Sequence, residues 1–514
     1  MHHIHWLDLL VVVCYIGAVL GIGIRMARRQ TDTEQYFVAK RSIPAWAMGM
    51  SMFATLITSI SFIAYPGNAY AGNWAELVAG FMALGALVVV GLVVVPFFRH
   101  AVGMSAYEYF ERRLGYSMRV YASFIFALGH LLKMGFIFYL VSLTIQSITG
   151  WNIFAVIAGV GIVTVCYTYV GGLEAVIWAD VVQGFILWAG IFGILGRLLL
   201  FTPGGPGAIL HYAWASHKIN FGSGDFDFTQ KGVLVMLFYG FFFYLQKYTA
   251  DQTIVQRYLV AKTDREAIRG VALGASLCIP VWALFLLIGT LTWSYYRITG
   301  EPLPATLTKT DEVFPYFLAT HIPSGLFGII LASLFSSAMG GISSDLNCLA
   351  VVGVEDYYRK LRPNAPDRQR LAMGKVFVAL AGFTCVLIAI TIAHASGAAL
   401  PLYFTVTSVF AGGLFGLFFL AFMSTRVNTT CAWIGVAASL LFSLYATLTS
   451  GKDHLLELGT WDFAWHSVMI GTIGHVVVIV VGYAASYFVK NRGTVDRRMT
   501  LWGWLEHRRN QVAL

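Results

Sequence analysis

The sequence predicts an all-α integral membrane protein with about thirteen transmembrane helices. Of the 514 residues, 58% are hydrophobic and only 11% are charged, and the mean hydropathy is +0.72. This composition excludes an ordinary soluble domain. The apolar residues gather in runs of about 20, the length that crosses the hydrocarbon core of a bilayer as a helix. These runs cover residues 6–26, 45–70, 74–98, 119–148, 150–169, 176–201, 230–249, 268–296, 322–352, 374–395, 400–423, 429–450 and 464–489.

The basic residues predict the orientation of the chain. If the N-terminus lies outside the cell, most of the 34 Lys and Arg residues fall in segments on the inner side. This positive-inside bias predicts a multi-pass protein of the cell membrane, with its N-terminus outside and its C-terminus in the cytoplasm. The net charge of +9 belongs to this basic collar and requires no nucleic-acid partner. We expect a monomer in the lipid bilayer.

One apolar span, from Ser51 to Gly72, is unusually rich in polar and helix-breaking residues. It contains four hydroxyl side chains and a Pro-Gly pair: Thr55, Thr58, Ser59, Ser61, Pro66 and Gly67. Because proline lacks the N–H that bonds one turn back, we expect a broken helix with unwound peptides at 65–67. Such groups must face protein or water, and secondary transporters bind solute and ion at such breaks. The alternative is a proline kink whose hydroxyls bond back to their own helix.

A second break is expected at the end of the span 230–249. An aromatic run there is followed directly by polar residues: Gln246, Lys247, Thr249 and Asp251. A polar interruption at the matching place in the second half of a transporter is what inverted repeats predict.

Five ionisable residues fall within the apolar spans: Glu76, Lys133, Asp180, Lys247 and Asp345. Each costs about 2.5–3.5 kcal/mol or more at the centre of a membrane helix, so each needs a partner or a functional role. A carboxylate among hydroxyls, as at Asp180, suits Na⁺ or a proton. The alternative for Asp180 is a salt bridge to an arginine near the cytoplasmic interface.

Four stretches of the chain resemble signatures of the sodium:solute symporter family. They are the lead from Glu34 to Pro44 with the polar span that follows it, YTYVGGLEAVIWADVVQG (167–184), TADQTIVQRYLVAK (249–262) and ASLFSSAMGGISSDLNCLA (332–350). The four occur in the order expected of the family. The stretch FATLITSISFIAYPGNAYAGNW is most similar to the sialic-acid branch.

The resemblance implies the leucine-transporter architecture, in which two inverted repeats of five helices surround a central site. The repeats would span residues 45–201 and 230–423, joined by an extracellular loop at 202–229. Residues 1–44 would hold the first transmembrane helix and a cytoplasmic lead. Residues 424–514 would hold two C-terminal helices and a basic cytoplasmic tail.

The resemblance also implies two sodium sites. The common site uses three backbone carbonyls, which match Ala54, Ile57 and Ser337. The second site, found in some members, uses a carboxylate and two serines, which match Asp180, Ser343 and Ser344.

The common sodium site is only half present. Gly340 and Gly341 occupy the positions of its two hydroxyls, and glycine offers no side-chain oxygen. Serines one turn earlier, Asp345 one turn later or a water could complete the site, or the site could be lost. Na⁺ is the favoured coupling ion, and proton coupling through Asp180 or Asp345 is the alternative.

The resemblance places the solute beside the hydroxyls of Thr58 and Ser61. Lys133 matches an arginine of the sialic-acid branch, and an ammonium opposite hydroxyls suits a carboxylated solute. Glu76 departs from the pocket of that branch, and an ion pair between Lys133 and Glu76 is the alternative for both residues. Phe243 and neighbouring rings could stack on a sugar ring or simply pack.

We therefore predict a cation-coupled symporter, with Na⁺ favoured, that imports a small polar solute, best matched by an acidic sugar such as sialic acid. Neutral sugars, inositol and monocarboxylates are the alternative solutes. A membrane sensor is remote, because the tail after Lys490 is too short for a signalling module. We expect neither an enzyme nor an organic cofactor, since HExxH and GxSxG motifs are absent and His130, beside Lys133, shows no obvious catalytic triad with a carboxylate.

Overall fold

The computed structural model describes residues 5–27, 32–305, 307, 310–394, 413–450, 456–489 and 496–512. These residues form helices and no β-strand, as the sequence predicts. The principal helices are α1 (Trp6–Ala27), α2 (Thr33–Val38), α3 (Ala45–Leu56), α4 (Ser59–Ala71), α5 (Ala75–Val90), α6 (Val94–Ala101), α7 (Glu108–Leu114), α8 (Tyr116–Thr149), α9 (Ile153–Phe201), α10 (Gly205–Ala215), α11 (Val233–Thr249), α12 (Gln252–Leu259), α13 (Asp264–Thr299), α14 (Val313–His321), α15 (Leu326–Val352), α16 (Arg359–Leu361), α17 (Asp367–His394), α19 (Leu414–Met423), α20 (Thr429–Thr449), α21 (Met469–Phe488) and α22 (Leu501–Val512).

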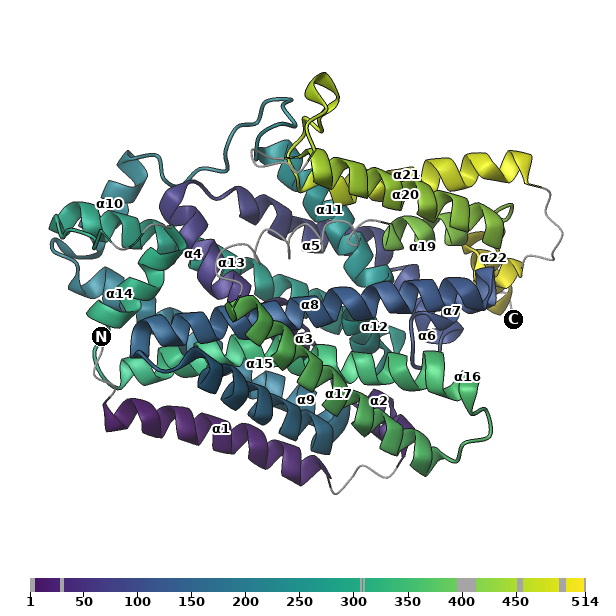
Figure 1. The fold of residues 1–514 in the computed structure, drawn as a ribbon, viewed down its shortest axis with the longest axis horizontal. Helices are drawn as coiled ribbons and strands as arrows, with labels where there is room; N and C mark the ends of the chain where they lie inside the picture. Colours follow the sequence, from purple (N-terminus) through teal and green to yellow (C-terminus); the bar gives the residue numbers. More distant parts are fainter. Residues whose placement is uncertain are drawn as a thin grey trace.

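The long helices lie side by side in one bundle (Figure 1). The short helices α6, α7, α16 and α22 gather at one end of the bundle, and α10 and α14 lie at the opposite end (Figure 1). Helix α10 lies within the stretch 202–229, which we predicted to be an extracellular loop. The boundaries of the two inverted repeats stay a prediction.

Eight of the described helices are long and apolar enough to cross a membrane, and three further pairs of helices are each bent at a short break. If each bent pair is one span, the described part of the chain holds up to 11. Helix α9 contains two predicted spans, 150–169 and 176–201, which meet where the backbone leaves helical geometry at Gly172 (φ +61°). The predicted span 400–423 starts outside the described residues, so the count of about thirteen stays a prediction.

The hydroxyl-rich span is broken, but not at the predicted place. Its two halves, α3 and α4, meet at an angle of 59°. The break falls at Ile57 and Thr58, whose backbones are extended, with ψ angles of 104° and 173°. The prediction of unwound peptides at 65–67 is wrong, because Pro66 lies inside α4.

The surroundings of Pro66 explain how α4 accommodates it. A proline inside a helix removes one hydrogen bond and distorts the preceding turn. Gly289 of α13 lies so close that a Cβ at residue 289 would be 2.1 Å from the Pro66 carbonyl oxygen. The two backbones are therefore in direct contact, and α13 shields the distorted part of α4.

The second predicted break is confirmed. Helices α11 and α12 meet at an angle of 51° around Ala250 and Asp251. The Asp251 carboxylate accepts a hydrogen bond from the Thr253 N–H (2.9 Å) and so caps α12. A third break, between α5 and α6 at an angle of 64°, interrupts the predicted continuous span 74–98. Gly91 follows α5 directly at this break, and glycine is a common residue at helix ends.

The helices pack in two groups. In the first group, α13 packs against α3, α4 and α5, and α11 packs against α5. In the second group, α9 packs against α1, α15 and α17, and α8 packs against α15 and α17. Helix α15 is buried along nearly its whole length and also contacts α3, α4 and α12. The breaks at 57–58 and 250–251 therefore both lie next to α15.

Replacing Gly289 by alanine is expected to destabilise the protein by about 1–3 kcal/mol, the usual range for forcing extra atoms into a packed interior. The added Cβ has no room beside Pro66, so α13 and α4 would have to separate. The matched control is Gly17→Ala in α1, where nothing lies within 4 Å of the new Cβ. Alanine should be neutral or slightly stabilising there. Thermal unfolding of the purified variants measures the difference, and equal midpoints would contradict the close packing.

Candidate functional site

Asp180 lies in the interior of the bundle, in the arm of α9 that follows Gly172. Its side chain is fully buried. Oδ2 accepts a hydrogen bond from the Ser51 hydroxyl of α3 (2.5 Å) and forms an ion pair with Arg257 of α12 (3.3 Å). The salt bridge that the sequence left as the alternative for Asp180 is therefore present. It is buried in the protein rather than exposed at a membrane interface.

Arg257 connects three helices at this point. The side chain is fully buried and also donates a hydrogen bond to the Ser344 hydroxyl of α15. That hydroxyl lies 2.9 Å from Oγ1 of Thr55 on α3. A buried guanidinium is destabilising unless its charge is matched, and Asp180 supplies the matching charge. The sequence analysis did not single out Arg257, although the residue lies in one of the four family-like stretches.

Gly340 of α15 opens a space among three oxygen atoms. A Cβ at residue 340 would lie 2.9 Å from Gln183 Oε1, 3.1 Å from the Ala54 carbonyl oxygen and 3.5 Å from Asp180 Oδ1. Of these atoms, Gln183 Oε1 and Asp180 Oδ1 are buried and have no hydrogen-bond partner among the described residues. Buried polar atoms are rarely left unpaired, so this cluster is short of a donor or a cation.

The three oxygens around Gly340 suit a sodium ion. Carboxylate, amide and carbonyl oxygens are hard donors, and hard cations prefer them. Gln183 thus brings a side-chain oxygen to the side of α15 where the implied site lacks a hydroxyl. The sequence analysis missed this role of Gln183. The signal was its spacing of three from Asp180, which puts both side chains on one face of α9.

The remaining residues of the implied sodium sites do not face this space with a free hydroxyl. Ser337 donates to the Leu334 carbonyl (2.8 Å) and Ser343 to the Gly340 carbonyl (3.2 Å), both within α15. Ile57 is buried at the break between α3 and α4. Gly341 faces that break as well, since a Cβ there would lie 3.1 Å from the methyl group of Thr58.

The candidate solute residues come from the α3–α4 break and from three other helices, α5, α8 and α11. Thr58 lies at the break with 9% of its surface exposed, and Ser61, one turn along, is partly exposed. Lys133 of α8 keeps 24% of its side chain exposed while its Nζ lies 2.7 Å from Asp345 Oδ2 of α15. Phe243 of α11 is partly exposed and lies 5.5 Å from the Nζ of Lys247, measured to the ring centre.

Glu76 and Lys133 do not pair with each other. The Glu76 carboxylate accepts hydrogen bonds from the Asn68 amide (2.7 Å) and from Lys231. The ion pair between Lys133 and Glu76, left open by the sequence, is therefore wrong. Each side chain has its own partners. Glu76 lies at the start of α5, whereas Lys133 lies in the middle of α8.

His130 lies between two carboxylates, which were not predicted from the sequence. Its Nδ1 is 2.8 Å from Asp345 Oδ1, and its Nε2 is 3.3 Å from Asp251 Oδ2. Asp251 in turn pairs with Lys247 (2.5 Å). Sequence spacing does not reveal these contacts, because the two aspartates come from α15 and from the break before α12, both more than 100 residues from His130 in the sequence.

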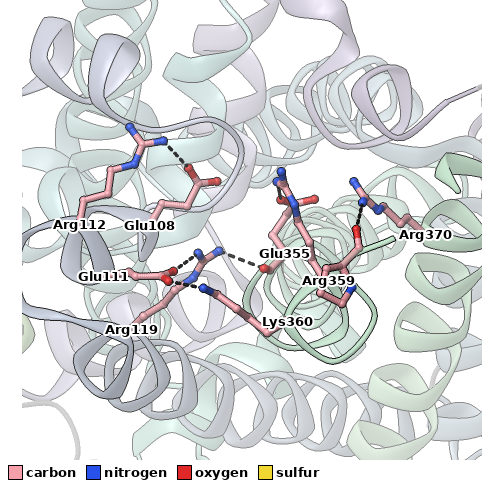
Figure 2. Close-up of a pocket in the computed structure, with 9 residues that line it drawn as sticks. Glu108, Glu111, Arg112, Arg119, Glu355, Arg359, Lys360 and Arg370 are labelled. Carbon is pink, nitrogen blue, oxygen red and sulfur yellow. Dashed lines mark hydrogen bonds and ion pairs between the residues drawn. The ribbon is translucent and has the colours of Figure 1, made fainter. Parts of the chain in front are cut away.

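A separate polar pocket lies at the end of the bundle where α7 and α16 meet (Figure 2). It has a volume of about 570 Å³, and charged side chains make up most of its lining. Basic residues outnumber acidic ones: Arg112, Arg119, Arg359, Lys360 and Arg370 face Glu108, Glu111 and Glu355. Figure 2 shows Lys360 of α16 paired with Glu111 of α7, whereas the pairs Arg112–Glu108 and Arg359–Glu355 each lie within one helical segment.

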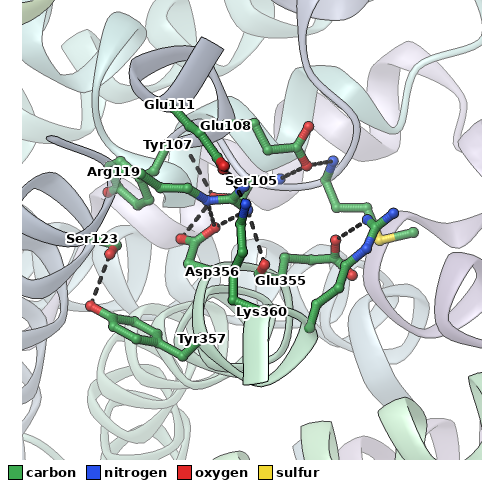
Figure 3. Close-up of polar contacts among 12 residues, drawn as sticks. Ser105, Tyr107, Glu108, Glu111, Arg119, Ser123, Glu355, Asp356, Tyr357 and Lys360 are labelled. Atoms are coloured by element: carbon green, nitrogen blue, oxygen red, sulfur yellow. Dashed lines mark hydrogen bonds and ion pairs between the residues drawn. The ribbon is translucent and has the colours of Figure 1, made fainter. Parts of the chain in front are cut away.

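Arg119 is the centre of these ion pairs (Figure 3). It donates to Asp356 Oδ1 (2.8 Å) and to Glu111 Oε2 (2.6 Å). Burial acts to raise the pKa of the Glu111 carboxyl, but hydrogen bonds from Lys360 and Arg119 outweigh it and hold that pKa below its ordinary value. The ionised Glu111 carboxylate therefore links α7 to the start of α8 through Arg119 and to α16 through Lys360.

Comparison with known proteins identifies the family. The family model for the sodium:solute symporter family matches residues 36–438. The sodium/sialic acid symporter NanT of Aliivibrio fischeri is 30% identical over 495 residues, which cover 95% of each chain. The sodium/sialic acid symporter SiaT of Proteus mirabilis is 29% identical and matches 94% of this chain and 95% of its own.

A solved structure shares the fold. It is a substrate-bound, outward-open state of a Na⁺-coupled sialic acid symporter, 28% identical, with a TM-score of 0.86 over 95% of this chain and 99% of that chain. The predicted all-α, leucine-transporter-like membrane fold is thereby confirmed. These relatives are transporters, so the prediction of a multi-pass transporter rather than an enzyme is confirmed as well. The chain belongs to the sodium:solute symporter family.

Proposed function

We propose that this protein couples the inward movement of Na⁺ to the import of sialic acid. The observation that carries the proposal is the oxygen cluster at Gly340, where buried oxygens of Asp180 and Gln183, without partners among the described residues, lie near the Ala54 carbonyl. Two relatives that match nearly the whole chain are named sodium/sialic acid symporters, which supports the choice of ion and solute.

The residues of the cluster would couple the ion to the break in α3–α4. A bound Na⁺ supplies positive charge to Asp180 Oδ1 and coordinates neutral oxygens without a proton transfer. Ala54 lies in the last turn of α3, just before the break at Ile57 and Thr58. Holding the Ala54 carbonyl against Asp180 and Gln183 would therefore fix the angle of the break and the position of the Thr58 hydroxyl.

The solute would bind on the far side of the same break. Thr58 and Ser61 offer hydroxyls for the polar groups of a sugar, and Lys133 offers an ammonium for its carboxylate. Lys133 already pairs with Asp345, so its ammonium would be shared between the Asp345 carboxylate and the carboxylate of the solute. Phe243 would cover an apolar face of the sugar ring. Glu76, held by Asn68 and Lys231, would shape the rim of the pocket.

We also propose that the protein acts as a monomer in the cell membrane, with the N-terminus outside and the C-terminus in the cytoplasm. The basic pocket between α7 and α16 supports this orientation, because positive residues concentrate on the cytoplasmic side of membrane proteins. Helix α22, near the C-terminus, lies at the same end of the bundle (Figure 1).

Proteoliposomes containing the protein are expected to accumulate labelled sialic acid when Na⁺ is present outside, and not when choline replaces it. Asp180→Asn and Gln183→Leu should each raise the Na⁺ concentration needed for half-maximal uptake by about tenfold or more, equivalent to about 1.4 kcal/mol of lost ion binding. Asp227→Asn, in an exposed loop, is the control and should behave as wild type.

Sodium-independent uptake of sialic acid would remove Na⁺ from the proposal. Uptake of a neutral sugar, inositol or a monocarboxylate in place of sialic acid would keep the symporter and change the solute. Wild-type sodium dependence in both Asp180→Asn and Gln183→Leu would show that the Gly340 cluster does not bind the ion.

Lys133→Gln is expected to weaken sialic acid binding by about 1.5–3 kcal/mol, the range for a hydrogen bond to a charged group. Lys133→Arg should keep the binding, because a guanidinium also pairs with a carboxylate. The matched control is Lys360→Gln, in the polar pocket between α7 and α16 at the end of the bundle. Equilibrium binding of labelled sialic acid to the purified variants measures the change. Unchanged affinity in Lys133→Gln would assign Lys133 to structure alone.

A further inference from the structure

The polar pocket between α7 and α16 carries more positive than negative charge. Five basic and three acidic side chains line it. One further carboxylate, that of the fully buried Asp356, pairs with Arg119 from behind the lining (2.8 Å). Even with Asp356 counted, five positive charges stand against four negative ones. The volume of about 570 Å³ is typical of pockets that hold small molecules.

Arg370 of α17 is the basic residue of this pocket that pairs with no carboxylate among the described residues. Its guanidinium donates to the Pro363 carbonyl (2.9 Å), and its Nε is buried without a hydrogen-bond partner. The other four basic residues of the lining each contact a carboxylate. Buried N–H groups are rarely left unpaired, so the Arg370 guanidinium lacks an acceptor.

Arg112 of α7 is only loosely paired. The Glu108 carboxylate lies 3.6 Å from its guanidinium, which is too long for a hydrogen bond. That carboxylate instead accepts hydrogen bonds from the backbone N–H groups of Gly103 (3.0 Å) and Met104 (3.3 Å). The Arg112 guanidinium donates to the Ala101 carbonyl (2.6 Å), a neutral acceptor that leaves its positive charge unmatched.

These two arginines lie on opposite sides of the pocket, with Arg359 and Lys360 between them (Figure 2). A guanidinium presents its N–H groups as a planar fork that matches two oxygens of one phosphate. A ligand with an anionic group at each end could therefore contact Arg112 and Arg370 at the same time.

Exposed aromatic side chains next to the pocket indicate that it lies at the level of the lipid head groups. Tyr116 is the first residue of α8, and its exposed ring lies 5.0 Å from the Nζ of Lys360. Trp433 of α20 is also exposed and donates to the Ser117 hydroxyl (3.3 Å). Tyr and Trp gather at membrane–water interfaces, where basic pockets bind lipid phosphates.

We propose that this pocket binds an anionic ligand with two phosphate groups, held by Arg112 at one side and Arg370 at the other. Each guanidinium donates to the oxygens of one phosphate, and the bound ligand thereby ties α7 to α17. Two sources supply this chemistry: a lipid with a two-phosphate head group, such as cardiolipin, and a soluble diphosphate. The site is separate from the Gly340 cluster and from the candidate solute residues.

The first test uses the full-length protein in uncharged detergent, without sodium, solute or divalent cations, so its outcome does not depend on the transport proposal. Calorimetric titration with inorganic diphosphate at constant ionic strength measures the affinity. Arg370→Gln and Arg112→Gln should each weaken binding by about tenfold or more, because each removes charged hydrogen bonds. Arg368→Gln is the matched control, since Arg368 lies on the same helix and is exposed outside the pocket lining.

The second test distinguishes the two sources. Thermal unfolding is compared in nanodiscs of phosphatidylcholine alone and of phosphatidylcholine with cardiolipin. A higher midpoint with cardiolipin in wild type and Arg368→Gln, lost in Arg370→Gln and Arg112→Gln, would support the lipid head group. Specific diphosphate binding without a cardiolipin effect would support a soluble ligand. Absence of both effects, or equal losses in Arg368→Gln and Arg370→Gln, would overturn the proposal.

Discussion

A helix that stops inside a membrane leaves backbone groups that lipid cannot bind, and this constraint organises the centre of the protein. The chain leaves helical geometry at Ile57–Thr58 and again at Ala250–Asp251. Each unpaired group costs several kcal/mol in hydrocarbon, so both breaks must be enclosed by protein. Helix α15 provides much of that enclosure, because it contacts α3, α4 and α12 and is buried along nearly its whole length.

The polar side chains of the interior gather where the backbone is interrupted. Asp180 and Arg257 connect α9 and α12 to the last turns of α3, and His130 connects α8 to the break before α12. Buried ion pairs contribute little to stability on balance, but removing one partner is strongly destabilising. Such pairs therefore fix which helices meet, and at which residues, more than they increase the total stability. Within the proposed transport cycle, they are the contacts that a change of conformation would have to rearrange.

In the proposed sodium site, Gly340 of α15 stands where the family resemblance implies a hydroxyl ligand. A serine at residue 340 would add a hydroxyl, but its Cβ would also stand 2.9 Å from Gln183 Oε1 and 3.1 Å from the Ala54 carbonyl oxygen. Glycine lets those oxygens and Asp180 Oδ1 approach one another around an open space. In the proposed site, the amide oxygen of Gln183, which comes from α9, would take the place of the hydroxyl ligand.

Local sequence patterns predicted the parts of this arrangement that depend on neighbouring residues. Apolar run lengths gave the spans, and polar residues after an aromatic run located the break at 250–251. The position of the first break was wrong because Pro66 is accommodated by Gly289, more than 200 residues away. The same limit applies to the partner of Lys133 and to the aspartates around His130. Those contacts join side chains from different helices, and no spacing within one helix encodes them.

We propose that the oxygens of Asp180, Gln183 and Ala54 form a sodium site beside the first helix break. Crystals grown with Tl⁺ in place of Na⁺ test it directly, because anomalous scattering locates a bound thallium ion without reference to transport. We expect an anomalous peak within bonding distance of Asp180 Oδ1, Gln183 Oε1 and the Ala54 carbonyl oxygen. A peak elsewhere in the bundle, with this cluster empty, would contradict it.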